Sequence, residues 1–367
     1  MHAMLTLLLS CTVHAGPPLP QAFCSGLVGP FTLSADGKRI YNYDQTVWDV
    51  PGRKLISSES GIGAFALATS GDGKWFAYGG NRSIFRIVDT RTHKVHWDLT
   101  LWAHGNTIIT HIAFTPDNRH LISLSANGIL AVWDVIDKKP ISLFVFPVRF
   151  KYFLDSQQDF LRSWRALHGA TPPHNVKTFV QQKLTLERGR QFSIHPNGKS
   201  LALPTSDSDV LLLEVASGKI LSTIKTEQET TMNVCYSRDG KMLAIGAGSA
   251  DNTAYLGKIE LWDVAKEKKI KTLKAHRHSV RQLQFSPDDT MLASTGTVDG
   301  VRVWNVSTGK QLYHLYAYDR NGDASEAICL AFTPDGKFLL TCGPDRCDGV
   351  FFHEVKTGKR ILQPLNK

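Results

Sequence analysis

The chain has 367 residues, more than one ordinary compact core usually contains, so the length predicts two domains or an architecture built from repeated modules. Hydrophobic residues make up 42% and charged residues 20%, a balance that excludes a disordered chain. The longest apolar run is well below the roughly 20 residues that span a bilayer, and the net charge of +9 favours acidic partners without specifying a fold.

Residues 1–15 have the pattern of a secretory signal. The apolar run Met4–Val13 is followed by Val13-His14-Ala15 and then by a Pro-rich exit, which fits cleavage after Ala15. No Lys or Arg precedes the run, so a short buried strand or a misassigned start is the alternative. We expect an exported protein, periplasmic or extracellular, if this signal is cleaved and a cytoplasmic one otherwise, with residues 16–27 as a linker.

One sequence pattern recurs along the rest of the chain. Each copy has an alternating apolar segment, a tight turn with Asp-Gly-Lys chemistry, a second short strand, a strand ending near Trp-Asp-Val and a Gly-Lys turn. Asn-Gly or Asp-Gly between alternating runs predicts a two-residue hairpin, and three turns per copy predict a four-stranded meander. One such sheet cannot bury both of its faces, so the copies are expected to stack around a ring as a β-propeller. The seven turn positions are Gly37, Gly73, Asn118, Gly198, Gly240, Asp289 and Gly336.

These copies resemble the WD40 family. The resemblance is carried by phrases such as Phe114-Thr-Pro-Asp-Asn118 with Trp133-Asp-Val135, and by their counterparts in the other copies. It covers nearly all of the chain after residue 27. It implies an all-β fold, a WD40-like β-propeller over residues 28–367.

The spacing of the turns sets the blade count. Asn118 and Gly198 are 80 residues apart, about twice the usual period of roughly 40–45 residues per blade, so residues 147–188 hold something extra. Asp155 and Gln158 form a capping-box pattern, and the apolar residues from Phe160 to Leu167 recur with helical spacing. We therefore expect seven four-stranded blades with a helix-bearing insertion. A degraded eighth blade is the alternative.

The WD40 resemblance also implies a structural network of hydrogen bonds within a blade. The sixth copy contains the full His–Ser–Asp–Trp set, whereas the third has Asn127 where the family has Asp. Because the Ser lies inside a sheet and not on an exposed, strained turn, this set is not expected to act as a hydrolase triad. The residues of the complete set are His276, Ser294, Asp299 and Trp304.

Motifs of cofactor and metal chemistry are missing from the sequence. It contains no phosphate-binding Gly-rich loop and no zinc-type His or Cys spacing, so we expect no cofactor and no metal. The loop from Asp319 to Glu326 is expected to be a polar turn and not a calcium site, and the basic run Lys266–Lys271 a solvated turn and not a nucleic-acid site. Cys342 and Cys347 are close enough to be bridged across a hairpin, with buried thiols as the alternative.

In a propeller of this family, the loops between blades and the loops between second and third strands share one face. Loops held by a rigid scaffold are the usual home of binding residues. The resemblance implies a monomeric, non-catalytic scaffold that binds another protein there, with no nucleic acid expected. The alternative is an exported propeller enzyme, a lactonase-like hydrolase or a lyase, that gathers carboxylates or histidines around a metal in the channel. The candidate partner-binding residues are Arg82, Trp102, Tyr255, Arg320 and Arg346.

Overall fold

The structure, a computed structural model, describes part of the chain: residues 31–42, 46–50, 54–57, 64–80, 85–98, 108–146, 176–178, 191–228, 230–248, 257–296, 300–315, 317–318, 324–325, 329–342 and 350–360. The expected signal, the linker at 16–27 and the expected helix at 155–167 lie outside these residues. Within the described part there are strands and turns, and none of it is a helix long and apolar enough to cross a membrane.

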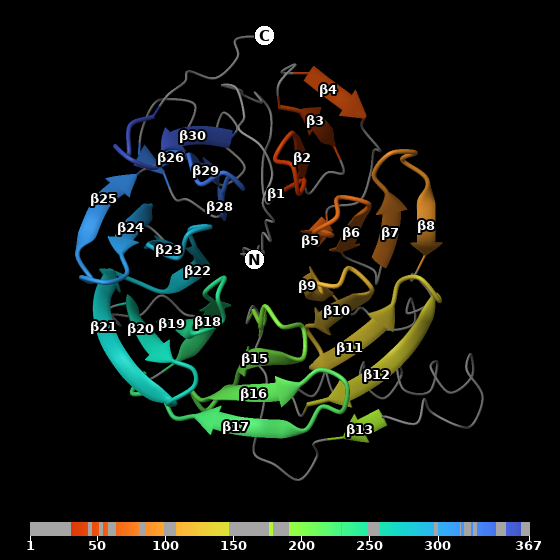
Figure 1. Cartoon of the computed structure of the whole chain (residues 1–367), viewed down its shortest axis with the longest axis horizontal. Helices are drawn as coiled ribbons and strands as arrows, with labels where there is room; N and C mark the ends of the chain where they lie inside the picture. The colour runs from red at the N-terminus through yellow and green to blue at the C-terminus, as the bar shows by residue number, and fades with distance from the viewer. Residues whose placement is uncertain are drawn as a thin grey trace, which may run out of the picture.

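The described strands form seven blades, which follow one another around a central channel (Figure 1). Blades 1 to 3 contain β1 (Phe31–Leu33), β2 (Arg39–Asn42), β3 (Val47–Asp49) and β4 (Lys54–Ser57); β5 (Ala64–Thr69), β6 (Trp75–Gly80), β7 (Phe85–Asp89) and β8 (Val95–Asp98); and β9 (Ile109–Phe114), β10 (His120–Ser125), β11 (Ile129–Asp134), β12 (Lys139–Val145) and β13 (Val176–Thr178).

Blades 4 to 6 repeat the four-stranded meander, and blade 7 has three described strands. They contain β14 (Ser193–Ile194), β15 (Ser200–Pro204), β16 (Val210–Glu214) and β17 (Ile220–Ile224); β18 (Thr231–Tyr236), β19 (Met242–Ala247), β20 (Gly257–Asp263) and β21 (Lys268–His276); β22 (Val280–Phe285), β23 (Met291–Gly296), β24 (Val301–Asn305) and β25 (Gln311–Leu315); and β28 (Cys329–Phe332), β29 (Phe338–Cys342) and β30 (Val350–Glu354). The short hairpin of β26 (Ala317–Tyr318) and β27 (Ala324–Ser325) precedes blade 7.

The wheel confirms the expected all-β, seven-bladed propeller. The doubled interval between the third and fourth copies contributes one described strand, β13, which pairs in parallel with the outer strand β12 and adds a fifth strand to blade 3. The described residues therefore contain no eighth blade, and the helix of the expected insertion lies outside them. Cys342 is buried opposite Cys329 in blade 7, whereas Cys347 lies outside the described residues.

The turn between the first two strands recurs in every blade. In blade 2, Asp72 Oδ1 accepts hydrogen bonds from Ser70 Oγ at 2.6 Å and from the Lys74 backbone N–H at 3.0 Å, and the Trp75 N–H donates to Ser70 Oγ at 2.8 Å. The backbone pair between Ser70 and Trp75 closes four residues, so the expected two-residue hairpin was wrong. The side chains of Ser70 and Asp72 bind the backbone N–H groups of a longer turn, which leaves Gly73 at φ +71°.

Apolar side chains hold each blade to the next. Each of the seven interfaces contains a cluster of buried residues from both blades, including the interface at which blade 7 meets blade 1. There Phe31 and Leu33 of blade 1 pack with Cys329 and Phe352 of blade 7, all with 0–2% of their surface exposed. The ring is therefore closed by the burial that a single sheet cannot achieve alone.

Candidate functional site

The five loop residues expected to bind a partner, Arg82, Trp102, Tyr255, Arg320 and Arg346, all lie outside the described residues. Most of the loop from Asp319 to Glu326 lies outside them as well. Of the second-to-third-strand loops, those of blades 3 and 4 are described. In blade 4, Thr205 N–H donates to Asp209 O at 2.8 Å, and Asp209 forms an ion pair with Lys225. This loop is a well-paired turn.

Three residues of the expected network lie together where β21 of blade 5 meets blade 6. His276 Nε2 and Ser294 Oγ are 2.8 Å apart, and Trp304 Nε1 donates to the same Ser294 Oγ at 3.0 Å. Asp299 lies outside the described residues. Ser294 is 0% exposed, so no substrate can reach its hydroxyl, and the three side chains tie strands together. In blade 3 the corresponding Trp133 Nε1 donates to Ser123 Oγ at 2.9 Å.

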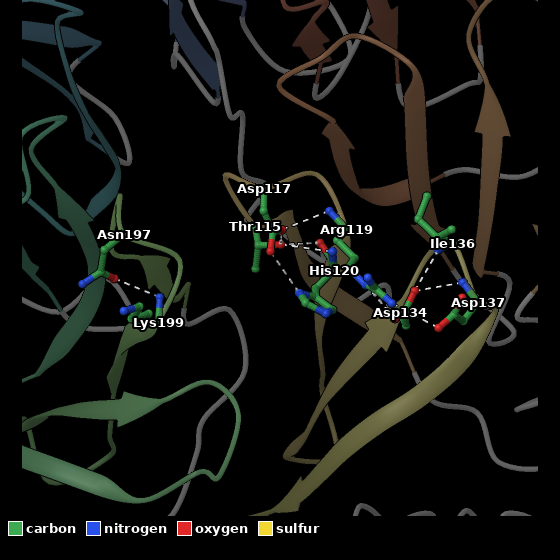
Figure 2. Close-up of polar contacts among 9 residues, drawn as sticks. All are labelled: Thr115, Asp117, Arg119, His120, Asp134, Ile136, Asp137, Asn197 and Lys199. Carbon is green, nitrogen blue, oxygen red and sulfur yellow. Dashed lines mark hydrogen bonds and ion pairs between the residues drawn. The ribbon is translucent and has the colours of Figure 1, made fainter.

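The opposite face of the wheel, where the first and last turns of each blade lie, contains a groove between blades 3 and 4. It has a volume of ≈ 440 Å³. Figure 2 shows its two sides, with Asp117 and His120 on the blade 3 turn and Asn197 and Lys199 on the blade 4 turn. Its floor is formed by apolar residues of both blades, Val132, Ile141, Val215 and Ala216.

Side chains of the outer strands bridge neighbouring blades on this face. Ser142 on β12 pairs with Val132, and in blade 5 Lys271 on β21 pairs with the equivalent Leu261. Both side chains bind a carbonyl oxygen of the next blade: Ser142 Oγ donates to Ala216 O at 3.0 Å and Lys271 Nζ to Ser307 O at 2.6 Å. Lys271 packs against Gly309 of the next blade, where an added Cβ would lie 2.5 Å from Lys271 Cδ, whereas the equivalent Gly218 is covered by the ring of Phe144.

Long side chains also bridge two other pairs of blades. Arg39 Nη1 donates to Thr90 O at 2.7 Å between blades 1 and 2, and His96 Nε2 lies 3.0 Å from Val135 O between blades 2 and 3. On this face the short Ser142 hydroxyl bridges blades 3 and 4.

The charged groups at the groove differ in whether other groups of the chain already bind them. Asp117 lies 3.4 Å from His120 and accepts hydrogen bonds from Thr115 Oγ1 at 2.5 Å and Arg119 N at 3.0 Å. Burial raises the pKa of the Asp117 carboxyl, but these contacts outweigh burial and hold the pKa below its usual value. Lys199 is exposed, and its ammonium group has no ion-pair partner among the described residues. The groove therefore offers one positive charge without an ion-pair partner among the described residues, beside an apolar floor and the carboxylate of Glu214, which accepts a hydrogen bond from Ser217 Oγ.

Next to the groove, Arg119 is fixed by two carboxylates of its own blade. Its guanidinium lies 3.0 Å from Asp134 and 3.1 Å from Asp137, as Figure 2 shows. Asp134 also accepts the backbone N–H groups of Ile136 and Asp137 at 3.0 and 2.9 Å. The blade 3 wall is thus rigid, and Arg119 is not available to a partner in the way that Lys199 is.

The side chains of the central channel test the alternative hypothesis that the protein is an enzyme. Among the described residues, no three His, Cys, Asp or Glu side chains gather closely enough to hold a metal ion. His195 is occupied: its Nδ1 accepts from Asn197 N at 3.1 Å and its Nε2 lies 3.2 Å from Gly240 O. His111 is buried, and burial lowers its pKa to about 3. The channel histidines thus make structural contacts or stay uncharged.

Sequence reasoning missed the groove. Ser142 and Ala216 are 74 residues apart and belong to different repeats, so no local pattern links them.

Two family models match parts of the chain. The model of the WD domain, G-beta repeat, matches residues 98–134 and 310–349, and the model of Eukaryotic translation initiation factor eIF2A matches residues 191–317. Both matched regions contain strands of the propeller described above.

Curated relatives are similar over part of their length. An uncharacterized WD repeat-containing protein of Synechocystis sp. is 29% identical over 41% of this chain and 40% of its own length. Apoptotic protease-activating factor 1 of Rattus norvegicus is 25% identical over 74% of this chain and 18% of its own length. Autophagy-related protein 18 of Schizosaccharomyces pombe is 30% identical over 44% of this chain and 46% of its own length. The chain thus spans less than half of each of these relatives.

The comparisons agree with the fold. Each of the seven blades contains the same turn after its first strand, the family model of this repeat matches two separate segments, and one WD repeat-containing relative matches 41% of the chain. The chain is a seven-bladed β-propeller that is similar to WD40-repeat proteins over these segments.

Proposed function

We propose that the chain is a non-catalytic scaffold that binds another protein, and that an extended acidic segment of this partner docks in the groove between blades 3 and 4. The observation that carries the proposal is the groove itself, with its apolar floor and the exposed Lys199 at its edge. A rigid closed wheel presents such a groove at low conformational cost, because little has to be ordered when the partner binds.

The chemistry of the groove determines what fits it. Val132, Ile141 and Val215 provide an apolar floor, and Lys199, which forms no ion pair with a described residue, lies beside it in a lining that also contains Asp117 and Glu214. A segment with an apolar side chain for the floor and an Asp or Glu for Lys199 satisfies both features. The net charge of +9 acts in the same direction, because it attracts an acidic partner over a longer range.

The names of the relatives support a binding role and not a shared reaction. They concern a protease-activating factor, an autophagy-related protein and nuclear distribution proteins, and they have no single chemical step in common. A propeller that serves such different proteins is more simply a platform than a catalyst. The satisfied or uncharged histidines in the described part of the channel support the same choice over a lactonase-like hydrolase or a lyase.

The test is a selection of displayed random peptides on the purified full chain, followed by measurement of the affinities of the selected peptides. The structure predicts peptides rich in Asp and Glu that bind in the micromolar range or tighter. Lys199→Glu should abolish binding, whereas Lys38→Glu, the same reversal on the equivalent turn of blade 1, should leave it unchanged.

A second pair of variants tests the groove and not the charge. Ser142→Lys introduces the side chain that blade 5 carries at the equivalent position, so the protein should fold and lose binding. Ser222→Lys, at the equivalent position of blade 4, should bind as the parent does. Selected peptides that bind the Ser142→Lys variant undiminished would contradict the groove as the docking site.

Two further expectations remain proposals of the same kind. Arg82, Trp102, Tyr255, Arg320 and Arg346 are proposed as anchors of a second docking surface on the other face, and alanine at each should weaken any peptide that Lys199→Glu does not affect. Export is checked by the mass of the mature N-terminus, which should begin at Gly16.

A further inference from the structure

Blade 7 contains two cysteines at directly opposite positions of neighbouring strands. Cys329 on β28 is the register partner of Cys342 on β29. Residues that lie opposite each other in an antiparallel pair point their side chains to the same face of the sheet. Both side chains are buried with 0% of their surface exposed, and both belong to the apolar cluster that joins blade 7 to blade 1. We refer to Cys329 and Cys342 as the seam pair.

The hydrogen bonds of the neighbouring residue give the spacing of the seam pair. The N–H and C=O of Leu330 are both bound by Gln282 of blade 6, so they point away from β29. Successive residues of a strand direct their backbone groups to opposite sides, so those of Cys329 point toward β29, and the register between these strands is unbroken. The Cα atoms of a hydrogen-bonded pair are about 5.5 Å apart, within the range of roughly 4.4–6.8 Å that a disulfide requires.

The repeat itself does not call for cysteine at this position. In each blade the equivalent pair begins four residues before the residue that opens the first turn. Among the pairs described there, that of blade 7 is the one that contains cysteine. The pairs of blades 2, 3, 5 and 6 are Ala66 with Gly79, His111 with Leu124, Asn233 with Gly246 and Gln282 with Thr295.

The seam pair lies at the interface where the ring closes (Figure 1). There Cys329 Sγ donates to Phe31 O of blade 1 at 3.6 Å, a contact between residues 298 positions apart. The other interfaces join blades that follow one another in the chain, whereas this one brings the two ends of the propeller together, which costs more loop-closure entropy. A covalent link between β28 and β29 would hold the surface that blade 7 presents to blade 1.

We propose that Cys329 and Cys342 form a disulfide between β28 and β29 when the chain folds in the presence of a disulfide oxidant such as oxidised glutathione. The thiolate of one cysteine attacks the oxidant, whose S–S bond breaks and releases one thiol. The thiolate of the other cysteine then attacks the mixed disulfide and releases the second thiol. Two electrons and two protons pass from the seam pair to the oxidant. The S–H donor to Phe31 O is lost, and the link between the strands replaces it.

Burial determines when this exchange takes place. An oxidant does not reach thiols with no exposed surface, so exchange in the folded protein waits for local opening of blade 7. During folding, β28 and β29 are brought together early, because only the turn from Thr333 to Phe338 separates them. The state of the seam pair therefore records the redox conditions under which the ring closed.

Peptide mapping tests the link directly, because trypsin places three cysteines in three peptides. Cys329 falls in residues 321–337, Cys342 in 338–346 and Cys347 in 347–356. The full reduced chain is unfolded in urea and refolded with oxidised and reduced glutathione. The folded protein is isolated by gel filtration, its unreacted thiols are blocked with N-ethylmaleimide, and it is digested without reductant.

Mass spectrometry should find peptides 321–337 and 338–346 joined after this refolding. After refolding with reduced glutathione alone, each of the two should carry its own blocking group. A link between peptides 338–346 and 347–356, or blocking groups on both seam cysteines after oxidising refolding, would overturn the proposal. The mapping is done on the parent chain, so it does not depend on how any variant folds.

Urea denaturation measures the consequence for the ring. The oxidised parent should unfold at a higher urea concentration than the reduced parent, because the link restricts the unfolded chain. Cys342→Ala should unfold at the same concentration in both buffers, whereas Cys235→Ala, which removes a thiol of blade 5, should keep the difference of the parent. Equal midpoints for the two states of the parent would contradict a stabilising link. No cysteine lines the groove between blades 3 and 4, so this result is independent of peptide binding there.

Discussion

Gln282 binds both backbone hydrogen-bonding groups of Leu330, a residue of the next blade, with its amide nitrogen 3.2 Å from the carbonyl oxygen and its amide oxygen 2.9 Å from the backbone nitrogen. The inner strand of a blade has an edge with no neighbouring strand of its own sheet. A side-chain amide reproduces at this edge the donor and acceptor pair that another strand would supply.

Gln282→Leu is therefore expected to destabilise the protein. It keeps the size of the side chain but leaves the N–H and C=O of Leu330 unsatisfied in a buried position, at a cost of about 2–4 kcal/mol. Urea denaturation measures this loss. The matched control is Gln311→Leu on the exposed start of β25, which should change the free energy of unfolding by roughly 0.5 kcal/mol or less. Equal effects of the two variants would refute the role of Gln282.

Ser294→Ala tests the network of blade 6. The variant removes the common partner of His276 and Trp304, so two buried groups lose a hydrogen bond. In blade 3, Ser123→Ala removes the contact of Trp133, while Asn127 stands in place of the network Asp. We expect Ser294→Ala to cost about 2–4 kcal/mol and Ser123→Ala about half as much. Thermal unfolding of both variants by calorimetry gives the comparison, and a larger loss for Ser123→Ala would contradict it.

Gly218→Ala and Gly73→Ala separate two reasons for glycine in a turn. Both residues have positive φ, at +64° and +71°. A Cβ on Gly218 would lie 2.0 Å from the ring of Phe144, whereas a Cβ on Gly73 would lie 3.8 Å from the nearest atom. Gly73→Ala should therefore cost only the backbone strain, about 1 kcal/mol, and Gly218→Ala about 1–3 kcal/mol more. Chemical denaturation of the two variants should give this order, and the reverse order would show that Phe144 moves aside freely.

Stability should fall as the solution is acidified below neutral pH. Burial, aided by the nearby charge of Arg360, lowers the pKa of His353 to about 4, and burial lowers that of His111 to about 3. In the unfolded chain a histidine has a pKa of roughly 6.5, so the unfolded state binds more protons in this range. Above a pH of about 6.5 both residues are neutral in the folded and the unfolded chain. As the pH falls below this value toward their pKa values in the folded protein, protonation of the unfolded chain lowers the free energy of unfolding.

His353→Gln removes one of these groups while a side-chain amide can still contact Thr341, which lies 3.1 Å from His353 Nε2. The free energy of unfolding of this variant should depend less on pH between about 6.5 and 4 than that of the parent. His93→Asn, on a turn at φ +57° that asparagine tolerates, should keep the parent's dependence. Urea denaturation at a series of pH values makes the comparison, and an unchanged slope in His353→Gln would show that this residue does not titrate as described.

The turns and the hydrogen bonds within a blade could be predicted from the sequence. The seven turn positions predicted from the repeat all have positive φ, and Ser294 and Trp304 lie in contact as the family resemblance implied. These features depend on residues within about ten positions of one another, so the order of the chain already brings them together. The length of the turn was predicted wrongly, because the hydrogen bonds of Ser70 and Asp72 to the backbone extend the loop.

Features between blades were decided by the tertiary structure. The hydrogen bond of Ser142 to Ala216 joins blades 3 and 4, the ring of His111 packs edge-on against Phe192, and the closed ring depends on Phe31 meeting Cys329 at the far end of the chain. The repeat specifies each blade, because its turns and strands form over short distances in the chain. Which side chains share an interface is decided only when the ring closes, because burial then joins residues that no local pattern relates.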